Sequence, residues 1–334
     1  MKFGAIPVAE AENAILAHGL RLETLTLRKG QVVTAERRRA LSAAGVTEVV
    51  AARLEPGDVG EDEAARRLAE RLAGAHLRLE PPFTGRVNLF AREAGLFLVD
   101  ANAIRRVNGV DEAITVATLA PFRTVAAGDM AATVKIIPFA TPGAALAAAC
   151  EALPAGGAVS IAPFRPLRFA VVSTLLPGLK ASVVAKTLQA LEARLAPAGA
   201  SIVAEERVAH EPIALARALE RLAAKGEALV IFGASAITDR RDVIPAAIEA
   251  IGGRIERFGM PVDPGNLLLL AARGDLPIVG APGCARSPKE NGFDWVLGRI
   301  LAGVPIKGAD IEAMGVGGLL MEIASRPQPR LGDG

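Results

Sequence analysis

The feature that most limits the fold is an alternation of two segment types in the second half of the chain. Phe169–Thr174 and Ala228–Phe232 are almost entirely apolar, which is typical of strands buried on both faces of a parallel sheet. The segment between them repeats apolar residues at spacings of three and four, as one face of a helix does: Val184, Leu188, Leu191 and Leu195. This alternation predicts the α/β fold class, with a three-layer C-terminal domain whose helices flank a parallel-type sheet.

In such a sheet, ligands bind beyond the carboxyl ends of the strands, so the loops that follow strands are the candidate sites. Further strands and helices are expected in this half, at Ser201–Ala204, Pro212–Ala223, Val243–Ile251, Leu267–Ala271 and Ile278–Val279. The last helix is predicted to begin at Pro288, with Ser287 as its N-cap and Glu290 completing a capping box, and to end at Gly303.

The clearest break in the chain lies at Pro163-Phe164-Arg165-Pro166, because prolines stop regular structure on either side. We therefore predict a mixed α+β N-terminal region of one or two subdomains over residues 1–162, an α/β domain over 167–326 and a tail over 327–334. In the first region, Asp62–Leu72 and Pro142–Ala152 are predicted helices, the second capped by Thr141. This region offers no candidate for chemistry.

The composition narrows the functional classes. Aromatic residues make up 4% of the chain, with one Trp and no Tyr, and the net charge is +2, so neither stacking platforms nor a charge excess favours nucleic-acid binding. Two cysteines and three separated histidines predict no disulfide framework and no His-rich metal site. The N-terminus lacks a signal-peptide core and no window approaches 18 uninterrupted apolar residues, so we expect a cytoplasmic protein without a membrane segment.

The first loop with unusual chemistry follows the strand that ends at Phe232. Its small residues would let an anionic group approach the backbone near a helix start, and its hydroxyls add donors. The candidate ligand-binding residues are Gly233, Ala234, Ser235 and Thr238. Two carboxylates, Asp239 and Asp242, are candidates for catalysis and for holding a divalent cation such as Mg²⁺. The alternative is structural: Thr238 or Asp239 caps the next helix, and Asp242 stabilises its first turn.

Two further loops combine Pro and Gly beside predicted strands, which signals tight turns. Their candidate binding residues are Pro264 and Gly265 in the second loop, and Gly280, Pro282, Gly283, Cys284 and Ser287 in the third. A plain turn is the alternative for the second loop. The thiol of Cys284 would have a lowered pKa if it lay near the start of the following helix, but no histidine stands beside it in sequence to activate a nucleophile.

Taken in this order, the loops resemble the molybdopterin-binding domain shared by molybdopterin molybdenumtransferases and molybdopterin adenylyltransferases. Gly233-Ala234-Ser235 followed by Asp239 is similar to the transferase loop Gly-Gly-x-Ser-x-Gly-Asp. The other resemblances are Arg241-Asp242-Val243-Ile244-Pro245 to Arg-Asp-Val-Thr-Pro, Pro264-Gly265 to Lys-Pro-Gly-Lys-Pro, and Gly280-Ala281-Pro282-Gly283 to Gly-Leu-Pro-Gly-Asn-Pro. Residues 168–325 carry the resemblance, which is greatest to the molybdopterin-binding half of molybdenum cofactor cytidylyltransferase fusion proteins.

The resemblance implies binding of molybdopterin or the molybdenum cofactor, a small-molecule pterin ligand, during cofactor biosynthesis or maturation. Lys186 and Thr187 lie where the family has an Asp-Ser/Thr-Asn cluster and would complete the pocket, but Ala185 replaces the acid. A molybdenumtransferase that inserts molybdate into adenylylated molybdopterin is therefore one alternative.

A non-catalytic carrier for a nucleotidyltransferase or molybdoenzyme partner is another alternative. A homo-oligomer is implied by resemblance, and the chain is either a stand-alone version or part of a longer fusion. A generic dinucleotide-binding enzyme is disfavoured, because no Gly-x-Gly-x-x-Gly follows a predicted strand with an acid about 20 residues further on.

Overall fold

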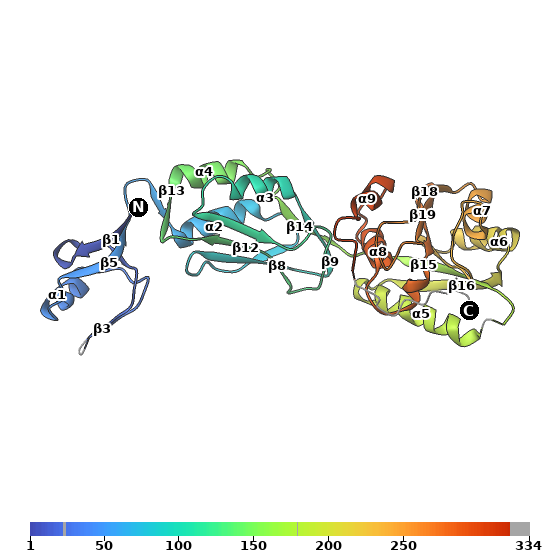
Figure 1. Ribbon diagram of the computed structural model, residues 1–334, viewed down its shortest axis with the longest axis horizontal. Coiled ribbons are helices and arrows are strands. Elements are labelled where there is room, and N and C mark those ends of the chain that lie inside the picture. The colour runs from blue at the N-terminus through green and yellow to red at the C-terminus, as the bar shows by residue number, and fades with distance from the viewer. Residues whose placement is uncertain (23–24, 179, 321–334) are drawn as a thin grey trace, which may run out of the picture. The chain divides into compact units, whose positions relative to one another are not determined.

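The computed structural model describes residues 1–22, 25–178 and 180–320 (Figure 1). By their contacts these residues form two compact units. Unit 1 comprises Met1–Glu93 and Phe97–Ala162, and unit 2 comprises Ala94–Leu96 and the residues from Pro163 onward. Residues 321–326 of the predicted second domain and the predicted tail, 327–334, lie outside the described residues. Within the described part of the chain, no helix has the combined length and hydropathy needed to cross a membrane.

Unit 1 begins with a small antiparallel sheet in the strand order β1–β5–β2, covered by helix α1. This part has a hydrophobic core of its own, which includes Leu16, Leu41 and Val49. Its elements are β1 (Lys2–Pro7), β2 (Ile15–Leu16), β3 (Leu20–Arg21), β4 (Thr26–Leu27), α1 (Ala35–Ala43) and β5 (Glu48–Arg53), with a 3₁₀ turn over Val8–Glu10.

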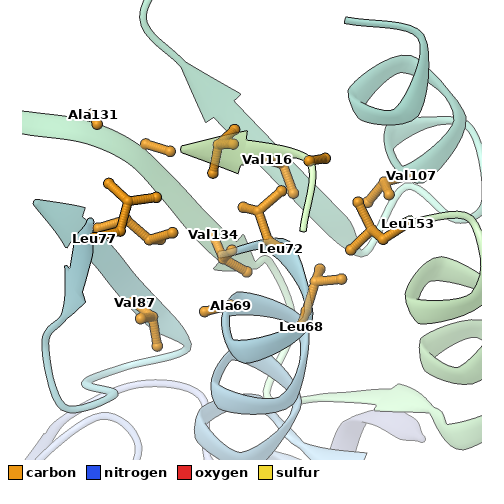
Figure 2. Close-up of a cluster of buried hydrophobic side chains, with 14 of the residues drawn as sticks. Leu68, Ala69, Leu72, Leu77, Val87, Val107, Val116, Ala131, Val134 and Leu153 are labelled. Atoms are coloured by element: carbon orange, nitrogen blue, oxygen red, sulfur yellow. The ribbon is translucent and has the colours of Figure 1, made fainter. Parts of the chain in front are cut away.

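The rest of unit 1 packs helices against antiparallel strands around a second core (Figure 2). Figure 2 shows Leu68 and Leu72 of α2 gathered with Val87 and Val134 of the sheet β10–β12–β8–β7. The elements are β6 (Asp58–Gly60), α2 (Glu61–Leu72), β7 (Leu77–Leu79), β8 (Arg86–Ala91), β9 (Gly95–Val99), α3 (Ala101–Asn108), β10 (Ile114–Thr118), β11 (Thr124–Val125), β12 (Met130–Ile136), β13 (Ala140–Pro142), α4 (Gly143–Glu151) and β14 (Val159–Pro163).

The predicted cap of helix α4 is wrong. Thr141 lies in strand β13, is fully buried, and its hydroxyl has no hydrogen-bond partner among the described residues. Pro142 holds the N-cap position instead, and no side chain caps the helix there. Proline has a fixed φ that suits a helix start, and pairing of Thr141 with Val59 of β6 keeps the hydroxyl away from the helix end.

Unit 2 is built on one six-stranded sheet in the order β16–β15–β17–β20–β19–β18. The first four strands in this order run parallel. Strand β19 is antiparallel to both of its neighbours, β20 and β18. The elements are β15 (Arg168–Leu175), α5 (Ala181–Leu195), β16 (Ser201–Ala209), α6 (Pro212–Ala223), β17 (Ala228–Phe232), α7 (Val243–Ala250), β18 (Arg254–Phe258), β19 (Leu269–Arg273), β20 (Leu276–Ala281), α8 (Gly292–Ala302) and α9 (Gly308–Ala313), with 3₁₀ turns over Ala196–Ala198 and Gly283–Arg286.

Alternate residues of each central strand enter two different cores. Phe169 and Val171 of β15 pack with α5, α8 and α9, whereas Ala170 and Val172 pack with α6 and α7. A strand whose two faces are both covered must be apolar along its whole length, which explains why β15 and β17 lack polar alternation. The predicted α/β fold, with helices on both faces of a parallel-type sheet, is confirmed.

Two local predictions in unit 2 are wrong. Helix α8 begins after Asn291 and not after Ser287: the Asn291 side chain accepts a hydrogen bond from the Phe293 N–H (3.1 Å), and the Asp294 carboxylate accepts one from the Asn291 N–H (2.8 Å). Ser287 instead ends the 3₁₀ turn. Strand β18 was not predicted, and β19 begins at Leu269. Gly303 ends α8 in the left-handed conformation, as expected.

Candidate functional site

The three predicted loops meet at one pocket of unit 2. They follow β17, connect β18 to β19, and follow β20, and together they enclose a pocket of about 470 Å³. Because β17 and β20 are neighbouring parallel strands, their carboxyl ends bring two of these loops to the same edge of the sheet. The pocket is lined by Val183, Gly233, Ala234, Ser235, Ala236, Ile237, Asp263, Pro264, Gly265, Asn266, Leu267, Ala281, Pro282, Gly283, Cys284 and Arg286.

The structure brings together only part of the predicted set. The residues that line the pocket are Gly233, Ala234, Ser235, Pro264, Gly265, Pro282, Gly283 and Cys284. The others do not line it: Lys186, Thr187, Thr238, Asp239, Asp242, Gly280 and Ser287. Gly280 lies in β20, where an added Cβ would come within 2.8 Å of the Ile237 Cδ1 atom, so this glycine serves strand–loop packing.

The first loop is held to the sheet by a buried threonine. The Ala234 N–H donates to the Thr174 hydroxyl (2.8 Å), and that hydroxyl also lies 2.9 Å from the His210 Nδ1 atom. Thr174 is 1% exposed at the end of β15. Because a buried N–H needs an acceptor, Thr174 fixes the backbone that forms this wall of the pocket.

Asp239 and Asp242 have local partners and lie outside the pocket lining. The exposed Asp239 carboxylate accepts from the Arg241 side chain (2.8 Å) and N–H (2.9 Å), which holds the pKa of this carboxyl below its usual value. Asp242 is the N-cap of α7 and accepts from the N–H groups of Val243 (2.8 Å) and Thr238 (3.2 Å). The expected helix cap is therefore present in this loop, but the cap residue is Asp242 and not Thr238 or Asp239.

The predicted metal site has no support in the structure. No group of three or more His, Cys, Asp or Glu residues that could hold a metal ion occurs in the described part of the chain. A magnesium ion needs several oxygen ligands in one place. The carboxylates of Asp239 and Asp242 instead accept hydrogen bonds from N–H groups of their own segment. The residues present therefore do not fit a magnesium ion at these two aspartates.

The second loop lies against the start of α8. Gly265 has a φ of +142°, and an added Cβ would lie 2.8 Å from the Gly292 nitrogen. The Gly292 N–H donates to the Pro264 carbonyl oxygen (2.9 Å). This close approach of two backbones requires glycine at position 265, and it places Asp263 and Asn266 at the pocket.

The nearly buried side chain of Arg194 stabilises the third loop. The Arg194 side chain on α5 is 9% exposed and pairs with Asp294 of α8 (Nε to Oδ1, 2.6 Å). Its other nitrogens donate to the carbonyl oxygens of Ala285 (3.0 Å) and Ser287 (2.6 Å). These bonds hold the two residues that flank Arg286, so Arg194 positions one wall of the pocket.

Arg286 was not among the predicted site residues, although it stands in the third loop. Its half-buried guanidinium donates to the Gly233 carbonyl oxygen (2.7 Å) and to the Thr187 hydroxyl (3.1 Å), and lies over the ring of Phe232. Burial lowers its pKa. Within the described ranges, no carboxylate lies within ion-pair distance of this guanidinium. The pocket therefore contains a cation that forms no ion pair with the described residues.

The other residues predicted near the pterin take different places. Thr187 is buried, and its hydroxyl donates to the Val183 carbonyl oxygen (2.8 Å) while accepting from Arg286. It thus contributes through Arg286 and does not line the pocket itself. Lys186 lies exposed on α5.

Cys284 lines the pocket, but its thiol has the opposite shift to the one expected. It lies in the 3₁₀ turn and not at the start of α8. Burial, together with smaller contributions from the charges of Asp294 and Asp263, raises the pKa of this thiol. A thiol with a raised pKa is a poor nucleophile at neutral pH.

Part of the pocket lining is aliphatic. Val183 of α5 and Leu267 of the second loop are 37% and 43% exposed, and Ile237 beneath the first loop is 5% exposed. These side chains offer apolar surface to a flat ligand in a pocket that no aromatic side chain lines among the described residues. The pocket lining therefore combines aliphatic side chains, a guanidinium and a carboxylate.

Unit 2 is thus an α/β domain with a pocket at the carboxyl edge of its sheet. Residues 170–302 match the family model described as "Probable molybdopterin binding domain". All pocket-lining residues, from Val183 to Arg286, fall inside the matched segment. The resemblance inferred from the three loops is therefore confirmed over this segment. The likeness to fusion proteins stays a prediction.

Two solved structures illustrate the low level of similarity between this chain and proteins of known structure. One is the molybdopterin biosynthesis MoeA protein from Pyrococcus horikoshii, with 13% identity, a TM-score of 0.32, and coverage of 91% of this chain and 75% of that one. Another is the molybdopterin biosynthesis enzyme MoaB from Thermus thermophilus, with 16% identity, a TM-score of 0.30, and coverage of 42% of this chain and 99% of that one. None of the curated proteins compared with the chain matches it.

Proposed function

We propose that this protein binds molybdopterin or the molybdenum cofactor in the pocket of unit 2, during biosynthesis or maturation of that cofactor. The family match supports the ligand class, because it covers the whole pocket. Molybdopterin combines a flat, hydrogen-bonding ring system with a phosphate group. The pocket offers aliphatic surface for the ring system and a cation for the phosphate group.

The observation that carries the proposal is the guanidinium of Arg286 at the pocket, which is half-buried and forms no ion pair with the described residues. Taking a cation out of water without a counter-charge is unfavourable, and a bound phosphate would supply that charge. Arginine binds phosphate with two parallel hydrogen bonds. The hydrogen bonds from the Arg286 nitrogens to Gly233 and Thr187 fix the direction of the guanidinium. The guanidinium would therefore be preorganised for the anion.

The test is calorimetry with purified molybdopterin under anaerobic conditions, using a variant that fills the pocket. Gly283 lines the pocket, and an added Cβ would meet nothing within 4 Å, so Gly283→Leu should fold and block the ligand. The matched control is Gly156→Leu in unit 1, where an added Cβ also meets open space. We expect binding by the unaltered protein and the control, and loss of binding in Gly283→Leu.

Two results would overturn this proposal. The first is no binding at tens of micromolar ligand by the folded, unaltered protein. The second is equal affinity in Gly283→Leu, since that would place the ligand elsewhere. Replacement of Arg286 by Gln should weaken binding about tenfold to a hundredfold, the range for one charge-assisted hydrogen-bonding group.

The local bonding of Asp239 and Asp242 supports a binding role over metal-assisted transfer. A molybdenumtransferase would instead hydrolyse adenylyl-molybdopterin in a manner that depends on molybdate and Mg²⁺. Turnover that is lost in the combined Asp239→Asn, Asp242→Asn variant would favour the enzyme. Co-purification of pterin without turnover would favour a carrier for a nucleotidyltransferase or molybdoenzyme, and light scattering would test the expected homo-oligomer.

A further inference from the structure

Asp263 is the only carboxylate among the pocket-lining residues of the described chain. Its backbone is fixed on both sides: the Asp263 N–H donates to the Gly318 carbonyl oxygen (2.8 Å), and its own carbonyl oxygen accepts from Leu320 (2.9 Å). The side chain is half-buried. Burial raises the pKa of the Cys284 thiol, and the charges of Asp294 and Asp263 add smaller contributions in the same direction.

Asp263 and Arg286 line the pocket from different loops, and Arg286 belongs to the loop that follows β20. Arg286 is bonded toward β17 and α5, through Gly233 and Thr187. Asp263 belongs to the loop between β18 and β19, on the other side of β20 in the sheet order. The positive and negative charges of the pocket lining are therefore carried by different loops.

A carboxylate can only accept hydrogen bonds, and its two oxygens suit a pair of parallel N–H donors. The aminopyrimidinone edge of a pterin presents such a pair, a ring N–H and an exocyclic amino group. We propose that Asp263 determines specificity by accepting hydrogen bonds from this edge, which orients the ligand with its phosphate toward Arg286. This inference rests on the proposed function, and it adds the chemical group that the pocket selects and the direction in which the ligand lies.

A pair of small ligands tests this selection. 6-Hydroxymethylpterin and 6-hydroxymethyllumazine have the same rings, but the lumazine carries an oxo group where the pterin carries the amino group. A site built to accept from an N–H group discriminates against an analogue that lacks it. We expect the unaltered protein to bind the pterin at least about tenfold more tightly than the lumazine, as measured by NMR titration.

In Asp263→Asn this preference should shrink to about twofold or less, because the amide can donate to the oxo group as well as accept. The matched control is Asp275→Asn, which removes the same charge from an exposed position in the turn between β19 and β20 and should keep the preference. Each ratio is measured on one protein sample. A variant that is partly unfolded therefore changes both affinities together and leaves the ratio unaltered.

Glycerol phosphate separates the two ends of the pocket. Its affinity should fall about tenfold in Arg286→Gln and should not fall in Asp263→Asn. An unchanged pterin-to-lumazine ratio in Asp263→Asn, or no preference in the unaltered protein, would overturn the role of Asp263. If molybdopterin still binds in that case, the proposed function stands; if molybdopterin itself does not bind, the proposed function fails as well.

Discussion

Replacement of Arg194 by Met should loosen unit 2 and the pocket together. The arginine lies on α5, is 9% exposed, and forms a 2.6 Å ion pair with Asp294 at the start of α8. It also donates to the carbonyl oxygens of Ala285 and Ser287. Methionine keeps much of the aliphatic volume, so the substitution tests the polar contacts and not the packing.

The expected loss follows from the groups left without partners. Breaking a buried ion pair by removing one partner lowers stability by about 3–5 kcal/mol, and each unsatisfied buried acceptor adds to it. Asp294 is 25% exposed, so water replaces part of the interaction and the lower end of the range applies. We expect Arg194→Met to reduce the free energy of unfolding of unit 2 by about 3 kcal/mol.

Urea unfolding followed by tryptophan fluorescence measures this loss directly. Trp295 is the only Trp, the chain has no Tyr, and Trp295 lies in α8 beside Asp294. The matched control is Arg207→Met, because Arg207 pairs with Glu205 at the same 2.6 Å, and Glu205 is also 25% exposed. The arginine there is 39% exposed, so its loss should lower stability by about 1 kcal/mol or less. Equal losses in the two variants would refute the reasoning.

Three further predictions concern single groups. Thr174→Val should lower the stability of unit 2 by about 1–3 kcal/mol in urea unfolding, because the Ala234 N–H loses its acceptor, and Thr174→Ser should restore it. In a Cys150→Ala background, iodoacetamide should alkylate Cys284 more slowly than free cysteine at about pH 8, since its pKa is raised; a faster rate would contradict this. Two arginines on its own helix lower the pKa of Glu63 to about 2. Its stabilising contribution should therefore be complete above the usual value of 4.5 and disappear as the pH falls toward 2, and carboxyl ¹³C NMR should give a titration midpoint near 2 and not 4.5.

The central strands of unit 2 were predictable because a strand that is buried on both faces is apolar along its whole length. Strand β17 has its predicted ends, Ala228 and Phe232, and all five of its residues are buried. Strand β18 has no such apolar run, because it lies at the edge of the sheet and none of its residues is fully buried. Edge strands such as Arg254–Phe258 can therefore resemble a charged loop in sequence.

Local capping chemistry is not sufficient to predict where helix α8 begins. Ser287 and Asn291 can both serve as N-caps, and each is followed three residues later by an acid. The choice is made by a contact distant in sequence, since Arg194 binds the Ser287 carbonyl oxygen and holds that residue in the preceding turn. The same limit applies to Arg286, whose role depends on partners 53 and 99 residues away.

Glycine occurs in the three loops for two different reasons. At Gly233 an added Cβ would lie 2.7 Å from the Ser235 carbonyl oxygen, and at Gly265 it would lie 2.8 Å from the Gly292 nitrogen. These two glycines are required by the fold whether or not a ligand binds, so the motif alone does not demonstrate a binding site. Gly283 differs, because its Cβ direction is open and no backbone contact of the described residues demands glycine there. A side chain at position 283 would conflict only with a molecule in the pocket, which is why Gly283→Leu separates ligand binding from folding more cleanly than any change at the other two glycines.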